Sequence, residues 1–437
     1  MTTVDNPQAP RKPLKPATAA HTALAILFVM NLLNYTDRSV LNAVLPLVKD
    51  EWMLSDKMLG ILNSAFIITY MVFSPIFGWL GDRVVRKWIA VGGIVVWSIM
   101  TAASGLARNF AQLFGLRMLF GTGEAGFSTV APTMIADLYP STARSRVLAV
   151  FYVAIPVGYA LGYIIGGAIG GRYGWRAVFP AVGIPSLLLV LPMLLVREPQ
   201  RGQSEDVTAE ELGEYLKTQA PLKNYLNLIR NGSYVCDSAA MILMTFVTGA
   251  FAWWGPTYFN RLRGLDLDKA NYYFGIATLL AGITGTFFGG WLADVLQKRI
   301  KSAYFLVSGV GMLLGVPALL VVMLIDIPQV YWPCVFFAEF CLFLNTGPAN
   351  AIILNVTSPN MRAGAFALNI FLIHALGDVI SPYIVGAVSD ATNLHVALVT
   401  IMPLITVAGG VAYLLGMRYL ERDMERALQE MKTKPRV

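Results

Sequence analysis

Long apolar stretches alternate with short polar ones along most of the chain. A helix needs about 20 apolar residues to cross the roughly 30 Å hydrocarbon core of a bilayer. Each stretch is that long, so we expect about twelve membrane helices, six on either side of a polar segment at 197–233. Their predicted ranges are 20–46, 58–80, 88–107, 110–139, 143–170, 175–196, 234–259, 270–294, 303–325, 329–357, 361–389 and 394–418.

Composition argues against a soluble protein. Of the 437 residues, 56% are hydrophobic and only 14% are charged, and the mean hydropathy is +0.60. A soluble globule of this size has more charge to present to water. The net charge of +7 comes from short basic clusters between apolar stretches, as membrane topology requires. We therefore expect the lipid bilayer to surround the chain, and no nucleic-acid partner.

The distribution of basic residues predicts the orientation. The termini and even-numbered loops hold 23 of the 33 Lys and Arg, and the odd-numbered loops hold 8, so the positive-inside rule places both termini in the cytoplasm. Residues 1–19 are expected to be a disordered tail, 197–233 a linker with short helices, and 419–437 a helix that lies on the membrane or in solvent. Short loops and the lack of a sorting signal favour a bacterial plasma membrane.

The two sets of six helices repeat a motif. Gly78-Trp79-Leu80-Gly81-Asp82, followed by Arg86-Lys87, returns 212 residues later as Gly290-Trp291-Leu292-Ala293-Asp294, followed by Lys298-Arg299. Such a repeat indicates a duplicated bundle, with halves at 20–196 and 234–418 and a pathway between them, as in many secondary transporters. The expected fold is therefore an all-α integral membrane protein of two pseudo-symmetric six-helix bundles.

Four charges lie inside predicted membrane helices: Asp37 and Arg38 in the first, Arg117 and Glu124 in the fourth. An ionisable side chain there costs at least a few kcal/mol unless it faces protein or water. At about 1.5 Å per residue, Asp37, Arg38 and Arg117 come to similar depth, with Glu124 deeper. Protonation of a carboxylate would free an arginine to bind an anion. The alternative is a permanently paired network that only fixes helix packing.

Five stretches resemble the Spinster family of the major facilitator superfamily: NYTDR from Asn34, FGWLGDRVVRK from Phe77, GTGEAGFSTVAPTMIADL from Gly121, RSRVLAVFYVAIPVGYALGY from Arg144 and HALGDVISPYIVGAVSD from His374. The resemblance implies transport of lysophospholipids or phosphorylated sphingoid bases, with Asp37 and Glu124 as protonation sites. Val85 stands where the superfamily loop commonly has glycine, and Tyr163 where its antiporter signature has proline. Symport and antiport therefore both stay open.

Two further groups of residues have predicted roles. Asp82, Arg83, Arg86 and Lys87 lie at a helix end, where they and Asp137 could latch the two halves together. A simple topogenic basic cluster is the alternative. The predicted ligands of a substrate headgroup are Arg38, Arg117, Asn345 and His374, and Asp378 lies one helical turn from His374. A packed, hydrogen-bonding histidine is the alternative for His374.

These features lead to one expected function with an alternative. We expect an alternating-access, proton-coupled carrier for an amphipathic anionic lipid, acting as a monomer; the alternative is a carrier of a small organic anion or drug-like acid. The chain shows no nucleophile elbow or glycine-rich phosphate loop, and its three cysteines lack metal-ligand spacing. We therefore expect no enzyme, metal or cofactor, with protons as the coupling ion.

Overall fold

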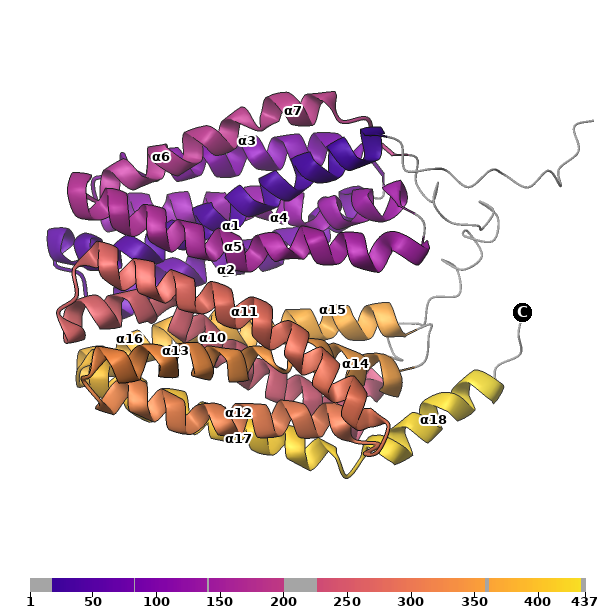
Figure 1. The fold of residues 1–437 in the computed structure, drawn as a ribbon. Helices are drawn as coiled ribbons and strands as arrows, with labels where there is room; N and C mark the ends of the chain where they lie inside the picture. The colour runs from indigo at the N-terminus through magenta and orange to yellow at the C-terminus, as the bar shows by residue number, and fades with distance from the viewer. Residues whose placement is uncertain (1–17, 82, 140, 200–225, 358–360, 434–437) are drawn as a thin grey trace, which may run out of the picture.

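The computed structural model describes residues 18–81, 83–139, 141–199, 226–357 and 361–433. These residues form helices and connecting loops, with no β-strand among them. Figure 1 shows two groups of roughly parallel helices, one indigo to magenta and one orange to yellow. Both groups run between a terminal end, where α1 begins and α17 ends, and a far end, where α1 ends and α17 begins. The predicted all-α, two-bundle fold is confirmed.

The first group, the N-half, contains six long helical units. Eleven helical units in the described ranges are long and apolar enough to span a membrane. The predicted span at 110–139 is α4, which is 29 residues long but is not among the eleven, because Arg117, Glu124 and its glycines lower its hydropathy. The N-half comprises α1 (Thr18–Trp52), α2 (Asp56–Gly81), α3 (Arg86–Ser104), α4 (Phe110–Leu138), α5 (Ser141–Tyr173) and α6 (Trp175–Leu188) with α7 (Val190–Leu195).

The second group, the C-half, repeats this arrangement with two interrupted helices. A break at Asn345 divides the predicted tenth span, and a five-residue π-helix lies within the eleventh. A short 3-10 helix, η1 (Leu226–Arg230), precedes the group. The C-half comprises α10 (Gly232–Arg263), α11 (Leu267–Gln297), α12 (Ala303–Leu324), α13 (Pro328–Phe343) with α14 (Thr346–Val356), α15 (Arg362–Ile373) with η2 (His374–Asp378) and α16 (Ser381–Ala391), and α17 (Leu394–Gly416).

The helix ends follow from local sequence. The side chain of Asn109 accepts a hydrogen bond from the N–H of Gln112, and Asn393 does the same for Val396, so each caps the first turn of a helix. Gly264 ends α10 in the left-handed conformation, with φ of 65°, which only glycine adopts without steric cost. These signals explain why the observed ends lie close to those predicted from the hydrophobic pattern.

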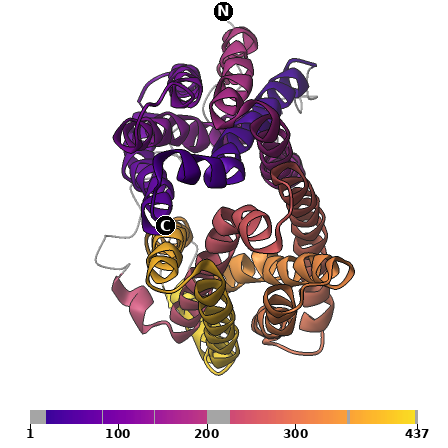
Figure 2. The same ribbon diagram turned by 90° about the vertical axis from the view of Figure 1, so that its left-hand side faces the viewer.

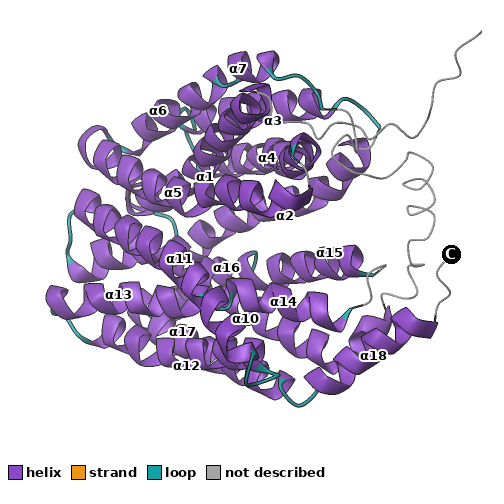
Figure 3. Cartoon of the chain, turned by 45° about the vertical axis from the view of Figure 1, so that its right-hand side comes forward, coloured by secondary structure: helices purple, strands orange, loops and turns teal. Residues whose placement is uncertain are grey.

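The halves meet at the far end. There α2 packs against α16, and α5 packs against α11. Gly60 allows this contact, because a Cβ at that position would lie 2.6 Å from the carbonyl carbon of Pro382. Figure 2, viewed from the far end, shows the halves facing one another, and Figures 1 and 3 show them diverging toward the terminal end. The described conformation is therefore held together at the far end.

The last helix, α18 (Leu420–Thr433), packs on the C-half. Leu420, Asp423 and Ala427 are buried on one face of it. The carboxylate of Asp423 accepts a hydrogen bond of 2.8 Å from the backbone N–H of Ser233, which satisfies a free donor in the first turn of α10. The first turns of α18 therefore lie against the C-half, and the position of 419–437 on the membrane or in solvent stays a prediction. Most of the predicted tail at 1–19 and of the linker lies outside the described residues.

Candidate functional site

The central charge of the N-half is Arg38 on α1, which forms an ion pair with Glu124 on α4. The Glu124 side chain is fully buried, while that of Arg38 keeps 16% of its surface exposed. The guanidinium lies over three aromatic rings, with its carbon 4.7 Å from the Tyr35 centroid, 4.8 Å from Phe66 and 5.5 Å from Tyr70. These rings and the carboxylate hold a cation in place inside the bundle.

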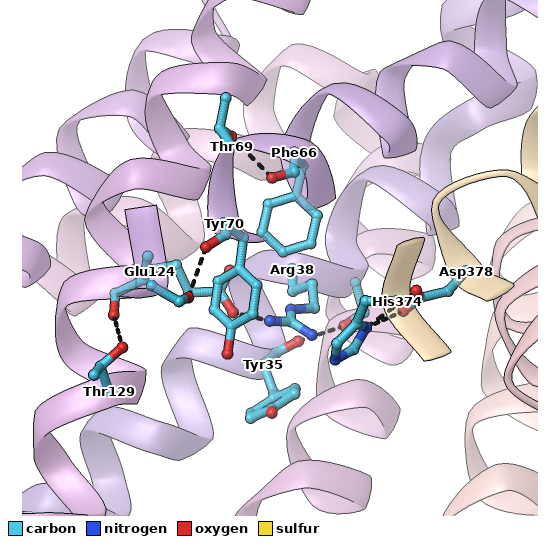
Figure 4. Close-up of polar contacts among 12 residues, drawn as sticks. Tyr35, Arg38, Phe66, Thr69, Tyr70, Glu124, Thr129, His374 and Asp378 are labelled. Carbon is cyan, nitrogen blue, oxygen red and sulfur yellow. Dashed lines mark hydrogen bonds and ion pairs between the residues drawn. The ribbon is translucent and has the colours of Figure 1, made fainter. Parts of the chain in front are cut away.

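His374 and Asp378 of the C-half face this pair. In Figure 4, Arg38 lies between Glu124 on one side and His374 on the other. The Tyr70 and His374 rings are 6.3 Å apart across the two halves. Nδ1 of His374 lies 3.0 Å from Oδ2 of Asp378, so the contact predicted from their spacing is present. The hydrophobic pattern did not predict that this turn would be a π-helix, a distortion frequent at functional sites.

The predicted cluster of four charges is arranged around Glu124, which pairs with Arg38 and also lies near Asp37 and Arg117. Asp37 points away from Arg38 into the interior of the N-half, where it is fully buried beside Trp97 and Ser186. Arg117 lies near Asp37 but donates a hydrogen bond of 3.3 Å to Ser104 Oγ. The reason is helical geometry, because consecutive residues on an α-helix point about 100° apart. Only Arg38 and Glu124 therefore lie at the interface between the halves.

A cavity of about 550 Å³ opens beside this site, between α5, α10, α11 and α13. Most of its wall is apolar or aromatic, and Glu339 and Asp378 supply its carboxylates. Oε1 of Glu339 accepts a hydrogen bond of 3.0 Å from Thr278, and Oε2 has no partner among the described residues. The sequence did not predict this cavity. Its walls include Tyr152, Pro156, Tyr159, Tyr163, Phe251, Ile283, Phe287, Leu342 and Phe343.

The described residues of the predicted latch lie within one half in this conformation. Arg86 pairs with Asp137 at 2.7 Å, as expected, and also with Glu198 at 2.9 Å. These contacts join the start of α3 to α4 and to the segment after α7. Arg83 is exposed and stacks over Trp79, with 4.1 Å between guanidinium carbon and ring centroid.

Two further residues of the predicted site, Lys87 and Asn345, have contacts away from Arg38. The backbone N–H of Lys87 donates to Glu198 Oε2, and its Nζ donates to the carbonyl of Leu194. Asp82 lies outside the described residues. Asn345 is buried at the junction of α13 and α14, where its Nδ2 donates to the carbonyl of Leu342 at 2.7 Å. Oδ1 of Asn345 has no partner among the described residues, and its role in binding a headgroup stays a prediction.

The arrangement can bind an anion, and nothing in the described ranges assembles a metal site. Groups of three or more His, Cys, Asp or Glu close enough to hold a metal ion are absent from those ranges. An anion entering between the halves would meet Arg38, and it would compete with Glu124 for the guanidinium. The adjoining apolar cavity offers space for a hydrocarbon group.

Comparison with known proteins supports this description. The sequence model of the Major Facilitator Superfamily matches residues 27–382. Protein spinster homolog 3 of Danio rerio is 35% identical over 454 residues, which cover 97% of this chain and 90% of that protein. Protein spinster of Drosophila melanogaster is 36% identical over 384 residues, 85% of this chain and 62% of the fly protein.

A solved structure has the same fold. The crystal structure of a bacterial homolog to the human lysosomal transporter Spinster, in an inward-facing and unoccupied conformation, superposes with a TM-score of 0.81. The alignment covers 95% of this chain and 98% of that one, at 22% sequence identity. At 22% sequence identity, the superposition shows that the two proteins share the arrangement of their helices, and it shows nothing further about function.

Proposed function

The chain belongs to the Spinster family of major facilitator transporters, and from this we propose that it is a proton-coupled carrier of an amphipathic anion with a phosphate-bearing head and one hydrocarbon chain. The main support for the proposal is the position of Arg38. This cation lies where the two halves face one another, and it contacts Glu124 and three aromatic rings. In the ion pair, the carboxylate of Glu124 balances the positive charge of the guanidinium. When the ion pair is broken, Arg38 is free to bind an anion.

Proton coupling follows from this competition. When Glu124 takes up a proton, it no longer attracts Arg38, and the guanidinium binds the phosphate of the substrate. When Glu124 releases the proton, its carboxylate regains the guanidinium and displaces the anion. Protonation and substrate binding therefore favour one another at the same arginine, which is the linkage that a coupled carrier needs. His374 faces Arg38 from the C-half and lets that half respond to the bound headgroup.

The cavity supports a lipid over a sugar acid. Two of its wall residues, Tyr152 on α5 and Phe287 on α11, are 46% and 64% exposed. The cavity is therefore not enclosed at these two helices, and we propose that it opens there toward the lipid around the bundle. A hydrocarbon chain can lie there with its end toward the bilayer, whereas a small polar anion would leave most of the apolar wall unused.

Alternating access is supported by the contacts at the far end. Asp56 of α2 pairs with Arg261 of α10 at 2.8 Å and accepts a hydrogen bond from Ser389 of α16. With the termini in the cytoplasm, as the positive-inside rule predicts, this conformation is inward-open. In the outward-open conformation the terminal ends close, and the basic cluster that includes Arg83 comes to the C-half. We place the protein in a bacterial plasma membrane.

Binding to purified protein tests the proposal. A lysophospholipid, a phosphorylated sphingoid base and a sugar acid would each be titrated at about pH 5.5 and about pH 7.5. We expect the lipids to bind more tightly to the wild type at the lower pH, and Glu124→Gln to bind them equally at both. Arg38→Ala should lose binding, while Thr406→Val, a change within α17, serves as the control. If only the sugar acid binds, the assignment of a lipid substrate is wrong. If binding does not change with pH, with Glu124→Gln or with Arg38→Ala, the ion pair has only a structural role.

A further inference from the structure

Two backbone carbonyls of the C-half lie four residues before a proline, and side chains of the N-half donate hydrogen bonds to both. The first proline, Pro256, lies inside α10. In an α-helix the N–H of each residue bonds the carbonyl four residues earlier, and proline has no N–H. The carbonyl of Ala252 therefore lacks its usual donor within α10. Without another partner it would be an unsatisfied acceptor inside the bundle.

The missing donors of the Ala252 carbonyl come from α1 and α5. The hydroxyl of Tyr163 on α5 donates to this carbonyl at 2.8 Å, and Nδ2 of Asn42 on α1 donates to it at 3.2 Å. The Tyr163 side chain is fully buried, and Asn42 is buried as well, so solvent does not compete for the acceptor. Both donors belong to the N-half, and the acceptor belongs to the C-half.

The same arrangement occurs at Pro382, near the start of α16. The backbone keeps helical dihedral angles between η2 and α16, so an N–H at position 382 would face the carbonyl of Asp378. Proline removes that donor. Nδ2 of Asn63 on α2 donates to the Asp378 carbonyl at 2.9 Å, and the neighbouring Ser64 donates to the carbonyl of Val379 at 2.5 Å. The N-half therefore supplies hydrogen bonds at both prolines.

The two acceptors lie on neighbouring helices beside the cavity. A Cβ at Gly249 of α10 would lie 2.7 Å from Cβ of Asp378, so α10 and η2 approach closely one turn before Ala252. Tyr163, Ala252 and Asp378 all line the cavity. A substrate in the cavity therefore lies beside both acceptors, and so does any water that enters the cavity.

We propose that Pro256 and Pro382 form a conformational lock, in which each proline leaves a carbonyl that the N-half satisfies only while the far end is closed. This lock rests on the alternating access of the proposed function, and it acts when the halves separate at the far end. The donors on α1, α2 and α5 then move away with the N-half, and the two carbonyls stay on the C-half. Lipid tails have no donor to replace them, so water must enter the cavity for the far end to open.

The lock differs from the ion pair of Asp56 and Arg261 at the same end. The side chain of Arg261 is 28% exposed, so salt weakens its attraction to Asp56. The hydrogen bonds to the carbonyls of Ala252 and Asp378 join neutral groups, which salt does not screen. We therefore expect part of the preference for the closed far end to remain at high salt and to depend on the two prolines.

Spin labels at two exposed far-end positions, Met53 in the N-half and Thr392 in the C-half, test the lock. Pro256→Ala and Pro382→Ala each restore an N–H to a freed carbonyl, which then needs no donor from the N-half. We expect each to raise the ratio of far-open to far-closed molecules about fivefold, at low and high salt alike. Pro317→Ala is the matched control, because Pro317 lies inside α12, which packs on helices of the C-half. Ratios equal to that of Pro317→Ala would overturn the proposal.

A second pair of variants separates the lock from a general loss of stability. Tyr163→Phe removes the hydroxyl that donates to Ala252, and it should raise the same ratio about threefold. Tyr258→Phe is its control, since the Tyr258 hydroxyl donates to the carbonyl of Met323 within the C-half. Tyr163→Phe should add little to Pro256→Ala, because both act on one carbonyl. Effects that multiply as if independent would contradict a shared acceptor and refute the lock.

The same measurements separate the lock from the proposed function. If the variants shift the ratio as expected, but neither pH nor a lysophospholipid changes it in the wild type, the lock stands and proton-coupled lipid transport fails. If pH and the lipid change the wild-type ratio, but Pro256→Ala and Tyr163→Phe leave it unchanged, the proposed carrier stands and the lock fails.

Discussion

Asp390 of α16 caps the first turn of α2 across the interface between the halves. Its carboxylate accepts hydrogen bonds of 2.7 Å from the backbone N–H of Asp56 and 2.9 Å from that of Lys57. Free N–H groups at a helix start favour an acceptor and a negative charge. A helix cap that normally comes from the same chain segment is therefore supplied by the other half, and it exists only while the far end is closed.

This contact predicts how Asp390 sets the conformational equilibrium. Asp390→Ala leaves both N–H groups of α2 without that acceptor when the far end is closed, so we expect a shift toward the far-open conformation worth about 0.5–2 kcal/mol. Spin labels on α2 and α16 at the far end would measure the shift as an increase in the population with a long distance between the labels. Asp390→Asn should shift the equilibrium less than Asp390→Ala, because its single amide oxygen can still accept one of the two hydrogen bonds. Identical distance distributions in Asp390→Ala and wild type would show that the cap does not hold the halves.

A second prediction concerns the geometry of Arg38. Arg38→Lys keeps a positive charge but loses the planar fork that can meet a phosphate and lie over Tyr35 and Phe66. We expect binding of a lysophospholipid to weaken at least about tenfold, which is about 1.4 kcal/mol. Isothermal titration would measure it. Arg176→Lys, at the far end outside the cavity, is the matched control, and equal losses in both variants would argue against a specific role of Arg38.

A third prediction concerns the mouth of the cavity. Ala149 lines the cavity, whereas its neighbour Val150 is 52% exposed and does not. Ala149→Trp should fill the opening and reduce the affinity for a long-chain lysophospholipid more than for its short-chain analogue, because the longer chain needs the occupied volume. Val150→Trp adds a similar ring outside the cavity and should leave the affinity ratio unchanged. If the ratio of long-chain to short-chain affinity changes equally in both variants, the hydrocarbon chain of the lipid does not bind in this cavity.

A fourth prediction explains the glycines of α5. A Cβ at Gly162 would lie 2.6 Å from the carbonyl oxygen of Thr36 on α1, and one at Gly158 would lie 2.7 Å from that of Leu32. Gly162→Ala should destabilise the protein by about 1–3 kcal/mol through overpacking. Gly171→Ala is the control, since a Cβ at Gly171 would have nothing within 4 Å. Thermal unfolding in detergent compares them, and equal stabilities would refute close packing of α1 on α5 as the reason for these glycines.

Local sequence was enough to specify the helices and their grouping. The spans predicted from apolar length agree with the observed helices, because hydropathy and capping depend on neighbouring residues such as Asn109 and Gly264. The same reasoning required Arg38, Arg117 and Glu124 to face protein or water, since a charge in lipid costs too much. The pairing of His374 with Asp378 followed from helical spacing alone.

Which charges meet, and where space remains, depended on the tertiary structure. Arg38 and Asp37 are neighbours in sequence, yet one pairs with Glu124 and the other is buried beside Trp97. The cavity between α5 and α11 and the closure of the far end by Asp56 likewise join residues from opposite halves. These features depend on the rotation and separation of whole helices, which arise from packing between distant segments, and local patterns of polarity do not encode them.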